Sequence, residues 1–308
     1  MEVISLKRRS LISLGLGGLA LAVGRGCLPT WSQQSTPLSP ISTVGLVETE
    51  EPLRFMAIGD VGTGSPEQYA VAQAMMQRQQ IAPSPFALLA GDNIYDRGEI
   101  GKIHQVFEQP YAELLTQGVK FYAALGNHDV GTNNGEDEVA YPGYNMSGRY
   151  YTFTQQSVQF FALDTNQAIT RGAESLWAEQ LQWLRTELQR SRQLWKVVFA
   201  HHPVYSSGQH GSTAILIEDL PPIFADYDVR LYINGHDHNY ERTVPIDGTT
   251  YITTGNGALL RPVGSSDWTA YASSQLGYTA FEVYSDRFVI QAIDSNNQIY
   301  DEASIVSA

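Results

Sequence analysis

The sequence has almost no cysteine. Its 308 residues contain a single one, Cys27, so no disulfide can form within the chain. Small exported domains often depend on disulfides because their cores are limited. After the N-terminal segments described below, about 255 residues remain, which is enough for one large domain with a substantial core. We therefore expect the folded part to be stabilised by its core and by any ions that it binds.

Basic residues are also scarce. The chain has 19 Lys and Arg against 32 Asp and Glu, and its formal net charge is −13. The first 27 residues carry four bases and one acid, which leaves about −16 for the rest. Such a chain lacks the basic footprint of a nucleic-acid-binding protein, so we expect no nucleic acid partner. If it acts on phosphates, bound cations and histidines must reverse the sign of its field locally.

The sequence also lacks a hydrophobic run that would span a bilayer stably. The apolar stretch Leu11–Val23 contains three glycines and follows Lys7, Arg8 and Arg9. A charged segment before a short apolar one predicts an export signal in residues 1–27, with no permanent transmembrane anchor. The arginine pair resembles a twin-arginine signal, with the twin-arginine export machinery as partner, and an ordinary Sec signal is the alternative.

Cys27 follows the apolar stretch directly and offers a lipid anchor as an alternative. The preceding Gly24–Gly26 segment departs from the pattern that lipidation requires, which argues against the anchor. Residues 28–51 are rich in Ser, Thr, Pro and Gln and predict a flexible linker. The predicted location is therefore the periplasm or the cell surface.

The next part of the chain alternates short apolar strands with helices. The pattern predicts strands at Leu53–Ile58, Phe86–Ala90 and Phe121–Leu125, and helices at Pro66–Gln80 and Ile103–Thr116. Pro110 is placed to break the second helix. This βαβαβ order predicts an α/β fold with a parallel sheet, in which function resides at the C-terminal strand ends.

The second half predicts further strands and two longer helices. We expect a polar loop over residues 133–148 and an interruption at Pro221 and Pro222 in the last helix. The predicted elements are a hairpin (Tyr150–Phe153, Val158–Leu163), helices (Glu174–Arg190, Thr213–Tyr227) and strands (Trp195–Ala200, Val229–Ile233, Thr250–Thr253, Thr279–Tyr284, Arg287–Ile293). Without a repeat or an internal boundary, residues 52–308 are predicted to form one domain.

Five short polar segments follow predicted strands and hold six of the seven histidines. They are Gly59–Gly62, Gly91–Tyr95, Gly126–Asp129, His201–His210 and Gly235–His238. Side chains at C-terminal strand ends point into a common crevice, so residues far apart in sequence can meet there. The recurrence of Asp, Asn, His and Tyr at these positions predicts a site for two metal ions.

These segments differ in how specific they are. A Gly-Asp pair alone is weak evidence for a metal site, because the pair is common in turns. The Gly-Asn-His-Asp and Gly-His-Asp-His segments are more specific. In an extended segment, alternation would place His236 and His238 on one side and Asp237 on the other. All five segments, in this order, argue against a purely structural role.

With these motifs the sequence resembles the metallophosphoesterases, and within them the small, single-domain purple acid phosphatases of the tartrate-resistant type. The resemblance covers about Arg54 to Val283 and depends most on Asp92 and Tyr95. Protein Ser/Thr phosphatases have an aspartate in the place of this tyrosine, whereas Asp96–Gly98 lies one place later here. In purple acid phosphatases the tyrosine is a phenolate ligand of ferric iron, a hard ion that suits phenolate oxygen. An ordinary core tyrosine is the alternative.

The resemblance implies a ligand set for two ions. The matching residues are Asp60, Asp92, Tyr95 and His238 for Fe(III), and Asn127, His201 and His236 for Fe(II), Zn(II) or Mn(II). Asp92 would bridge the ions and screen the repulsion between cations about 3.5–4 Å apart. His201 is preferred over His202 because the family's ligand directly follows its strand, two residues before Pro203.

Two further histidines are implied to be catalytic. The family places a histidine such as His128 at the substrate phosphate, and His210 matches a second outer histidine. Either could stabilise charge on the phosphoryl oxygens or protonate the leaving oxygen. For His210, a surface loop histidine is the alternative. Asp129 and Asp237 are predicted to support the site rather than to bind ions, and His104 to be solvated.

The resemblance implies a calcineurin-like domain over residues 52–308, folded as a four-layer αββα sandwich of two mixed β-sheets flanked by helices. It implies an acid phosphatase that hydrolyses small phosphoric monoesters with a metal-bound hydroxide, and we expect an optimum at mildly acidic pH. Two alternatives remain open. One is a phosphodiesterase or nucleotidase on the same site, and the other is a non-enzymatic surface protein that binds metal or phosphate.

Overall fold

The computed structural model of the protein describes residues 51–307. The predicted export signal with Cys27, and nearly all of the predicted linker, lie outside these residues. Contacts group the described residues into one compact unit. Within the described residues, no helix combines the length and the apolar character needed to cross a membrane.

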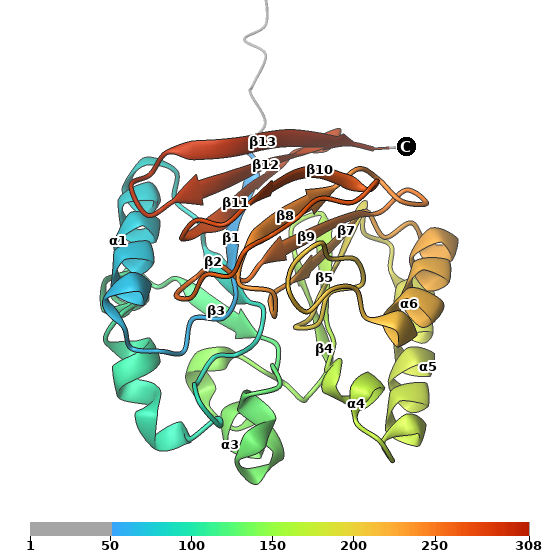
Figure 1. Cartoon of the computed structure of the whole chain (residues 1–308). Coiled ribbons are helices and arrows are strands. Elements are labelled where there is room, and N and C mark those ends of the chain that lie inside the picture. Colours follow the sequence, from blue (N-terminus) through green and yellow to red (C-terminus); the bar gives the residue numbers. More distant parts are fainter. Residues whose placement is uncertain (1–50, 308) are drawn as a thin grey trace, which may run out of the picture. The chain divides into compact units, whose positions relative to one another are not determined.

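Six strands form the first sheet, in the spatial order β13–β12–β11–β1–β2–β3 (Figure 1). They are β1 (Leu53–Ile58), β2 (Phe86–Leu89), β3 (Lys120–Ala123), β11 (Gly277–Val283), β12 (Arg287–Asp294) and β13 (Ile299–Val306). Strands β1, β2 and β3 are parallel, as the βαβαβ pattern predicts, and β11 joins the other side of β1 in antiparallel pairing. The sheet is therefore mixed.

Seven strands form the second sheet, in the order β10–β8–β9–β7–β6–β5–β4. They are β4 (Tyr151–Gln155), β5 (Val158–Ala162), β6 (Trp195–Phe199), β7 (Leu231–Asn234), β8 (Tyr240–Thr243), β9 (Thr250–Thr254) and β10 (Thr269–Ser273). Strands β5, β6, β7 and β9 are parallel, and β4, β8 and β10 run against their neighbours. This sheet is mixed as well.

Helices cover the outer faces of the two sheets, with α1 on one side and α5 and α6 on the other (Figure 1). The α-helices of the described residues are α1 (Pro66–Ile81), α2 (Ala112–Thr116), α3 (Glu136–Val139), α4 (Asn166–Ile169), α5 (Glu174–Arg190) and α6 (Ala214–Tyr227). Helix α1 begins where its sequence predicts. The Ser65 side chain accepts a hydrogen bond from the Gln68 amide, and Pro66 occupies the first turn.

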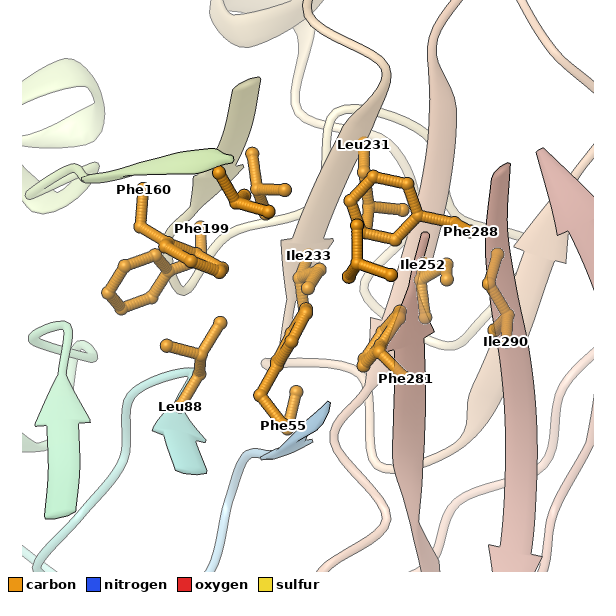
Figure 2. Packing of buried hydrophobic residues seen from close by; sticks show 14 of the residues in the cluster. Phe55, Leu88, Phe160, Phe199, Leu231, Ile233, Ile252, Phe281, Phe288 and Ile290 are labelled. Carbon is orange, nitrogen blue, oxygen red and sulfur yellow. The ribbon is translucent and has the colours of Figure 1, made fainter. Parts of the chain in front are cut away.

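An aromatic core lies between the sheets. Phe55 of β1 stacks on Phe281 at a centroid distance of 4.5 Å and meets Phe160 of the second sheet edge-on at 5.1 Å. Figure 2 shows these rings with Ile233 and Ile252 in the same cluster. Two further clusters fill the spaces between each sheet and its helices. The predicted four-layer αββα sandwich is confirmed.

Prolines act differently in the two predicted helices that contain them. The helix predicted over residues 103–116 is divided into η2 (His104–Glu108) and α2, with Pro110 between them. The predicted interruption of the later helix is wrong, because α6 continues through Pro221 and Pro222. Leu220, Ile223 and Phe224, next to the prolines, are fully buried, and this packing offsets the missing backbone hydrogen bonds.

Other differences are local. The polar segment 133–148, predicted as a loop, contains three short helical pieces: η4 (Asn133–Gly135), α3 and η5 (Pro142–Tyr144). Strands β8, β10 and β13 were not predicted as separate elements. The ends of the predicted strands differ by one or two residues from those observed, as is usual where the pairing partner decides the last residue.

Candidate dinuclear metal centre

All seven predicted ligands meet at one edge of the sandwich. Asp60 follows β1, Asp92 follows β2, Asn127 follows β3, His201 follows β6 and His236 follows β7. The two sheets therefore contribute side chains from opposite sides of one cleft, each from the C-terminal end of a parallel strand. The placement matches the prediction for these segments.

Unusual backbone conformations direct three of these side chains. Asp60, Asp92 and His236 have φ angles of 57°, 53° and 71°, in the left-handed region that residues other than glycine rarely adopt. Because the backbone of His236 is left-handed, its segment is not extended, and the predicted alternation of side chains does not apply to it. His236 and His238 nevertheless both reach the cluster, while Asp237 bonds to the loop that carries His210.

Two glycines allow the close approach of these segments. A Cβ at Gly126 would lie 2.2 Å from both the amide nitrogen and Oδ1 of Asp92, and one at Gly235 would lie 2.4 Å from Oδ2 of Asp60. Real Cβ atoms do not come so near to such atoms. The glycine at the start of each of these two segments is therefore required for the carboxylates to reach the centre.

Tyr95 lies among more acceptors than its proton can serve. Its hydroxyl oxygen is 3.0 Å from Oδ2 of Asp92, 3.2 Å from Oδ1 of Asp60 and 3.3 Å from Nε2 of His238. Both carboxylates are buried. An electron-rich group of three oxygens and one nitrogen fits a hard cation, which would replace the missing protons.

His201 shows the same deficit on the other side of Asp92. Its Nδ1 donates to the carbonyl oxygen of Ala90 at 2.9 Å, so in the neutral ring Nε2 carries a lone pair. That lone pair faces Oδ1 of Asn127 at 3.1 Å and Oδ1 of Asp92 at 3.4 Å. Nδ1 of His236 lies 3.1 Å away. Facing acceptors with too few protons again fit a cation.

These contacts define two groups that share residues. Asp60, Asp92 and His201 have ligand atoms within 4.8 Å of one another, and so do His201, His202 and His236. A fixed ring orientation for His201, set by its bond to a backbone carbonyl, is typical of a metal-binding histidine. The donor set therefore fits two ions side by side.

Burial perturbs the titration of the site. Desolvation, with the neighbouring Asp92 charge, raises the pKa of Asp60 well above its usual range, and burial among these carboxylates raises the pKa of Tyr95. Burial and the adjacent histidines lower the pKa of His236. Burial lowers the pKa of His238 to about 4, helped by the charge of Arg261. His236 and His238 therefore remain neutral and able to bind metal at mildly acidic pH.

The two predicted catalytic histidines flank this cluster. The His128 ring lies 4.6 Å from the Tyr95 ring, and its backbone amide donates to Oδ1 of Asp92 at 3.0 Å. The exposed His210 ring stacks on His236 with centroids 4.2 Å apart. One histidine thus lies on the tyrosine side of the centre and the other on the His236 side.

Asp129 and Asp237 support the site, as predicted. Asp129 accepts hydrogen bonds from the backbone amides of Asn93, Ile94 and Gly126, which joins the Asp92 and Asn127 segments. Burial and the Asp92 charge raise the pKa of Asp129 to about 7. Asp237 accepts from the Ser206 hydroxyl and from the His210 amide. His104 is exposed and bonds to Glu108, as predicted.

The sequence did not assign a role to Asp164 or to the two residues after it. Asp164 pairs with Arg149 at 2.8 Å and bonds to Asn166, whose side chain donates to the carbonyls of Leu125 and Gly126. Thr165 bonds to Nδ1 of His202 at 2.8 Å. Asp164 follows the C-terminal end of β5, just as the predicted ligands follow their strands, and this position in the sequence could have indicated its place beside the site.

The structure has one hollow beside the predicted metal ligands and a larger one apart from them. One of about 310 Å³ is lined by Tyr95, Lys102 and Leu259 among others, directly beside the predicted ligands. Another, of about 690 Å³, lies between α1 and α2 and shares no lining residue with the cluster. Because the chemistry requires the metal ligands, the smaller hollow is the better candidate for a substrate pocket.

Comparisons with known proteins agree with the geometry. Residues 53–240 match the family model described as calcineurin-like phosphoesterase. The chain is 31% identical to human tartrate-resistant acid phosphatase type 5 over 243 residues, which are 68% of this chain and 74% of that protein. It is 30% identical to purple acid phosphatase 7 of Arabidopsis thaliana over 231 residues, or 67% and 70%.

Solved structures show the same fold. The chain superposes on GAP50, titled the anchor in the inner membrane complex of Plasmodium, with a TM-score of 0.76 and 22% identity, covering 84% of this chain and 90% of that one. For purple acid phosphatase PPD1 from yellow lupin seeds the TM-score is 0.69 at 21% identity, covering 82% and 53%.

The fold and the site together define a metal-dependent hydrolase of phosphoric esters, and the chain belongs to the calcineurin-like phosphoesterase family. Within that family its relatives are tartrate-resistant and purple acid phosphatases. The resemblance predicted from the motifs is confirmed.

Proposed function

We propose that the protein is an acid phosphatase that hydrolyses phosphoric monoesters with a dinuclear metal centre. The observation that carries this proposal is the convergence of seven side chains with oxygen or nitrogen ligand atoms, with Asp92 between the others. Fe(III) would be held by Asp60, Asp92, Tyr95 and His238, and Fe(II), Zn(II) or Mn(II) by Asp92, Asn127, His201 and His236. When bound, the two ions supply positive charge for the phosphoryl oxygens and a more acidic water.

The outer histidines would act on the substrate. Nδ1 of His128 donates to the carbonyl of Asp96 at 2.5 Å, which leaves Nε2 directed to the site, 3.9 Å from Oδ2 of Asp92. Once protonated, this nitrogen could donate to a phosphoryl oxygen. His210, exposed beside His236, is placed to protonate the leaving oxygen.

The direct test is the rate of hydrolysis of an aryl phosphate monoester against pH, with metal content measured in the same sample. We expect turnover with a maximum at mildly acidic pH. Replacing His128 or His210 with alanine should lower kcat by about 10²–10⁴ without loss of metal, as removing an acid–base group does. A maximum only above about pH 8 would contradict Fe(III) at the Tyr95 position.

A phosphodiester measured in parallel tests the alternative substrate class. Faster hydrolysis of an aryl phosphodiester than of the monoester would make the protein a diesterase on the same site. Tight phosphate binding without hydrolysis of either ester, by protein that holds two metals, would indicate a binding role instead.

We also propose that residues 1–27 export the protein through the twin-arginine pathway, past a linker at residues 28–51. The support is the sequence Lys7, Arg8, Arg9 before a short apolar stretch. Replacing Arg8 and Arg9 with lysine should retain the protein in the cytoplasm of a bacterial host, whereas a Cys27→Ser variant should still be exported. Export of the lysine variant would favour a Sec signal.

A further inference from the structure

Glu241 is a buried carboxyl group close to the candidate centre, and nothing in the proposed reaction uses it. It belongs to β8, shortly after His238, and is only 1% exposed. Its neighbours in the strand, Tyr240 and Arg242, both bond to Asp301 of the first sheet. Because side chains alternate along a strand, Glu241 points to the opposite, outer face of the second sheet.

On that face Glu241 accepts hydrogen bonds from the loop that carries His210. The Ser207 amide donates to Oε2 of Glu241 at 2.6 Å, and the Ser207 hydroxyl donates to Oε1 at 2.8 Å. Two donors of one serine therefore converge on one carboxyl group. Since Ser207 shortly precedes His210 in the same loop, this double contact fixes the chain close to the predicted catalytic ring.

Glu241 also holds the loop between β9 and β10. The Thr269 hydroxyl, where this loop enters β10, donates to Oε1 of Glu241 at 2.6 Å. From the same loop, Nη1 of Arg261 donates to Nε2 of His210. One carboxyl group thus anchors both the segment that carries His210 and the loop whose arginine contacts the His210 ring.

The surroundings of Glu241 fit an anchor for these loops and not an ion pair. Among residues 51–307 no cation pairs with Glu241, and its contacts come from amide and hydroxyl donors. Burying a carboxyl group without a cation lowers stability unless hydrogen bonds replace its hydration. An apolar side chain would fill the same space without that cost, but it could not hold Ser207. What the carboxyl group contributes is therefore a fixed loop conformation.

We propose that Glu241 is a positioning residue for the reaction, which fixes the His210 ring beside the leaving oxygen by holding Ser207. This inference rests on the proposed function, in which His210 protonates that oxygen. Asp237 supports the other end of the loop by accepting from the His210 amide at 2.8 Å. Loss of the Glu241 anchor should therefore displace His210 and leave the metal ligands in place.

The test uses two phosphate monoesters that differ in their need for a proton. An alkyl alcohol must be protonated as it departs, whereas nitrophenolate departs without a proton. For ethyl phosphate, Glu241→Gln should lower kcat about 10–100-fold, because a displaced acid donates poorly. For nitrophenyl phosphate the loss should stay below about threefold. Glu113→Gln, at an exposed residue of α2 away from the ligands, is the matched control and should change neither rate.

A double-mutant cycle shows whether Glu241 acts through His210. In a His210→Ala background, Glu241→Gln should change kcat for ethyl phosphate by less than about twofold, because the ring that it positions is already absent. Metal content should be the same in all variants. Equal losses for the two esters, or a full further loss in the His210→Ala background, would overturn the proposal.

Ser207→Ala carries the same test if Glu241→Gln fails to fold. It removes a single hydroxyl donor, so the loss for ethyl phosphate should again exceed the loss for nitrophenyl phosphate, at several-fold smaller size. Equal rates of the variant and the wild type on both esters would count against the anchor.

Amide hydrogen exchange gives a readout without turnover. In Glu241→Gln the amides of Ser207 and His210 should both exchange at least about tenfold faster than in the wild type, because the loop opens more often. Faster exchange at Ser207 alone would contradict a role at His210. If the wild type hydrolysed neither ester, the proposed function would fail, while exchange at the His210 amide would still decide whether Glu241 fixes this loop.

Discussion

Tyr95 is the residue that most distinguishes this site from one built for two divalent ions. Its hydroxyl lies within 3.3 Å of Asp60, Asp92 and His238, in the place that the resemblance to purple acid phosphatases implies for it. Spacing alone could not show that its one proton faces two carboxylate oxygens and an imidazole nitrogen. That deficit is a property of the folded site.

Tyr95→Phe tests this tyrosine directly. The variant should fold, because only the hydroxyl is lost, and its affinity for Fe(III) should fall by at least about tenfold. Any visible absorption from a phenolate–iron bond should vanish with it. Unchanged absorption in an iron-loaded Tyr95→Phe sample would exclude Tyr95 as a ligand.

The pKa of His238 predicts how the site responds to acid. Burial lowers it to about 4 from an ordinary value of 6.5, so the folded ring stays neutral between these values while an unfolded chain takes up a proton. The stability of the metal-free protein should therefore fall as the pH drops from about 6.5 to 4. Bound metal should persist at pH 5 and be lost below about pH 4, which dialysis and metal analysis would show.

At the scale of elements, the sequence predicts where the strands end, but it does not predict how the segments after them come together. Each apolar run predicted a buried parallel strand, and the Gly-Asp, Gly-Asn or His-His pair after it predicted a ligand position at the C-terminal end of that strand. The left-handed conformations of Asp60, Asp92 and His236 arise from packing between segments distant in sequence, and so does the brace from Asp164 and Asn166. No local pattern carries that information.

The same reasoning explains the missed elements. Strands β8, β10 and β13 mix polar with apolar residues, and β10 and β13 are also partly exposed, so their pairing partners define them more than their composition does. Pro221 and Pro222 predicted an interruption of α6, but the helix continues through both of them. Burial against the second sheet outweighed the local cost.

Gly126→Ala tests the close approach of two of these segments. The new methyl group would lie 2.2 Å from Asp92, so the loop must shift and both ions should bind more weakly, with activity reduced by at least about 10²-fold. Gly101→Ala is a matched control, because a Cβ at Gly101 meets nothing within 4 Å. Metal content and activity equal to those of the control would contradict this account.

At the scale of the whole molecule, the cluster between the sheets is one of three buried hydrophobic clusters that stabilise the domain. Phe55 contacts rings from both sheets and is fully buried. Phe55→Ala should lower the free energy of unfolding by about 3–5 kcal/mol. Ile81→Ala, at a residue that is 80% exposed, should change it by less than about 0.5 kcal/mol. Denaturant unfolding of both variants checks the contrast.

Metal binding should stabilise the whole domain, because ions bind the folded state and not the unfolded chain. At a free metal concentration 100 times Kd, each ion adds about 2.7 kcal/mol to the free energy of unfolding. A chelator should therefore lower Tm, and a melting curve with and without EDTA measures the shift. An unchanged Tm in protein shown to have lost its ions would refute this.

The bond from His201 to the carbonyl of Ala90 has a wider consequence. His201 follows β6 of the second sheet and Ala90 follows β2 of the first, so the ring that would bind metal also connects the ends of strands from the two sheets. Since the predicted ligands come from both sheets, bound ions would link the two sheets at the open edge of the sandwich. In a domain without cysteine, removal of the ions by a chelator would lower stability in the way that reduction lowers the stability of a disulfide-linked protein. The concentration of free metal, and not the redox potential, would then set the lifetime of the folded state.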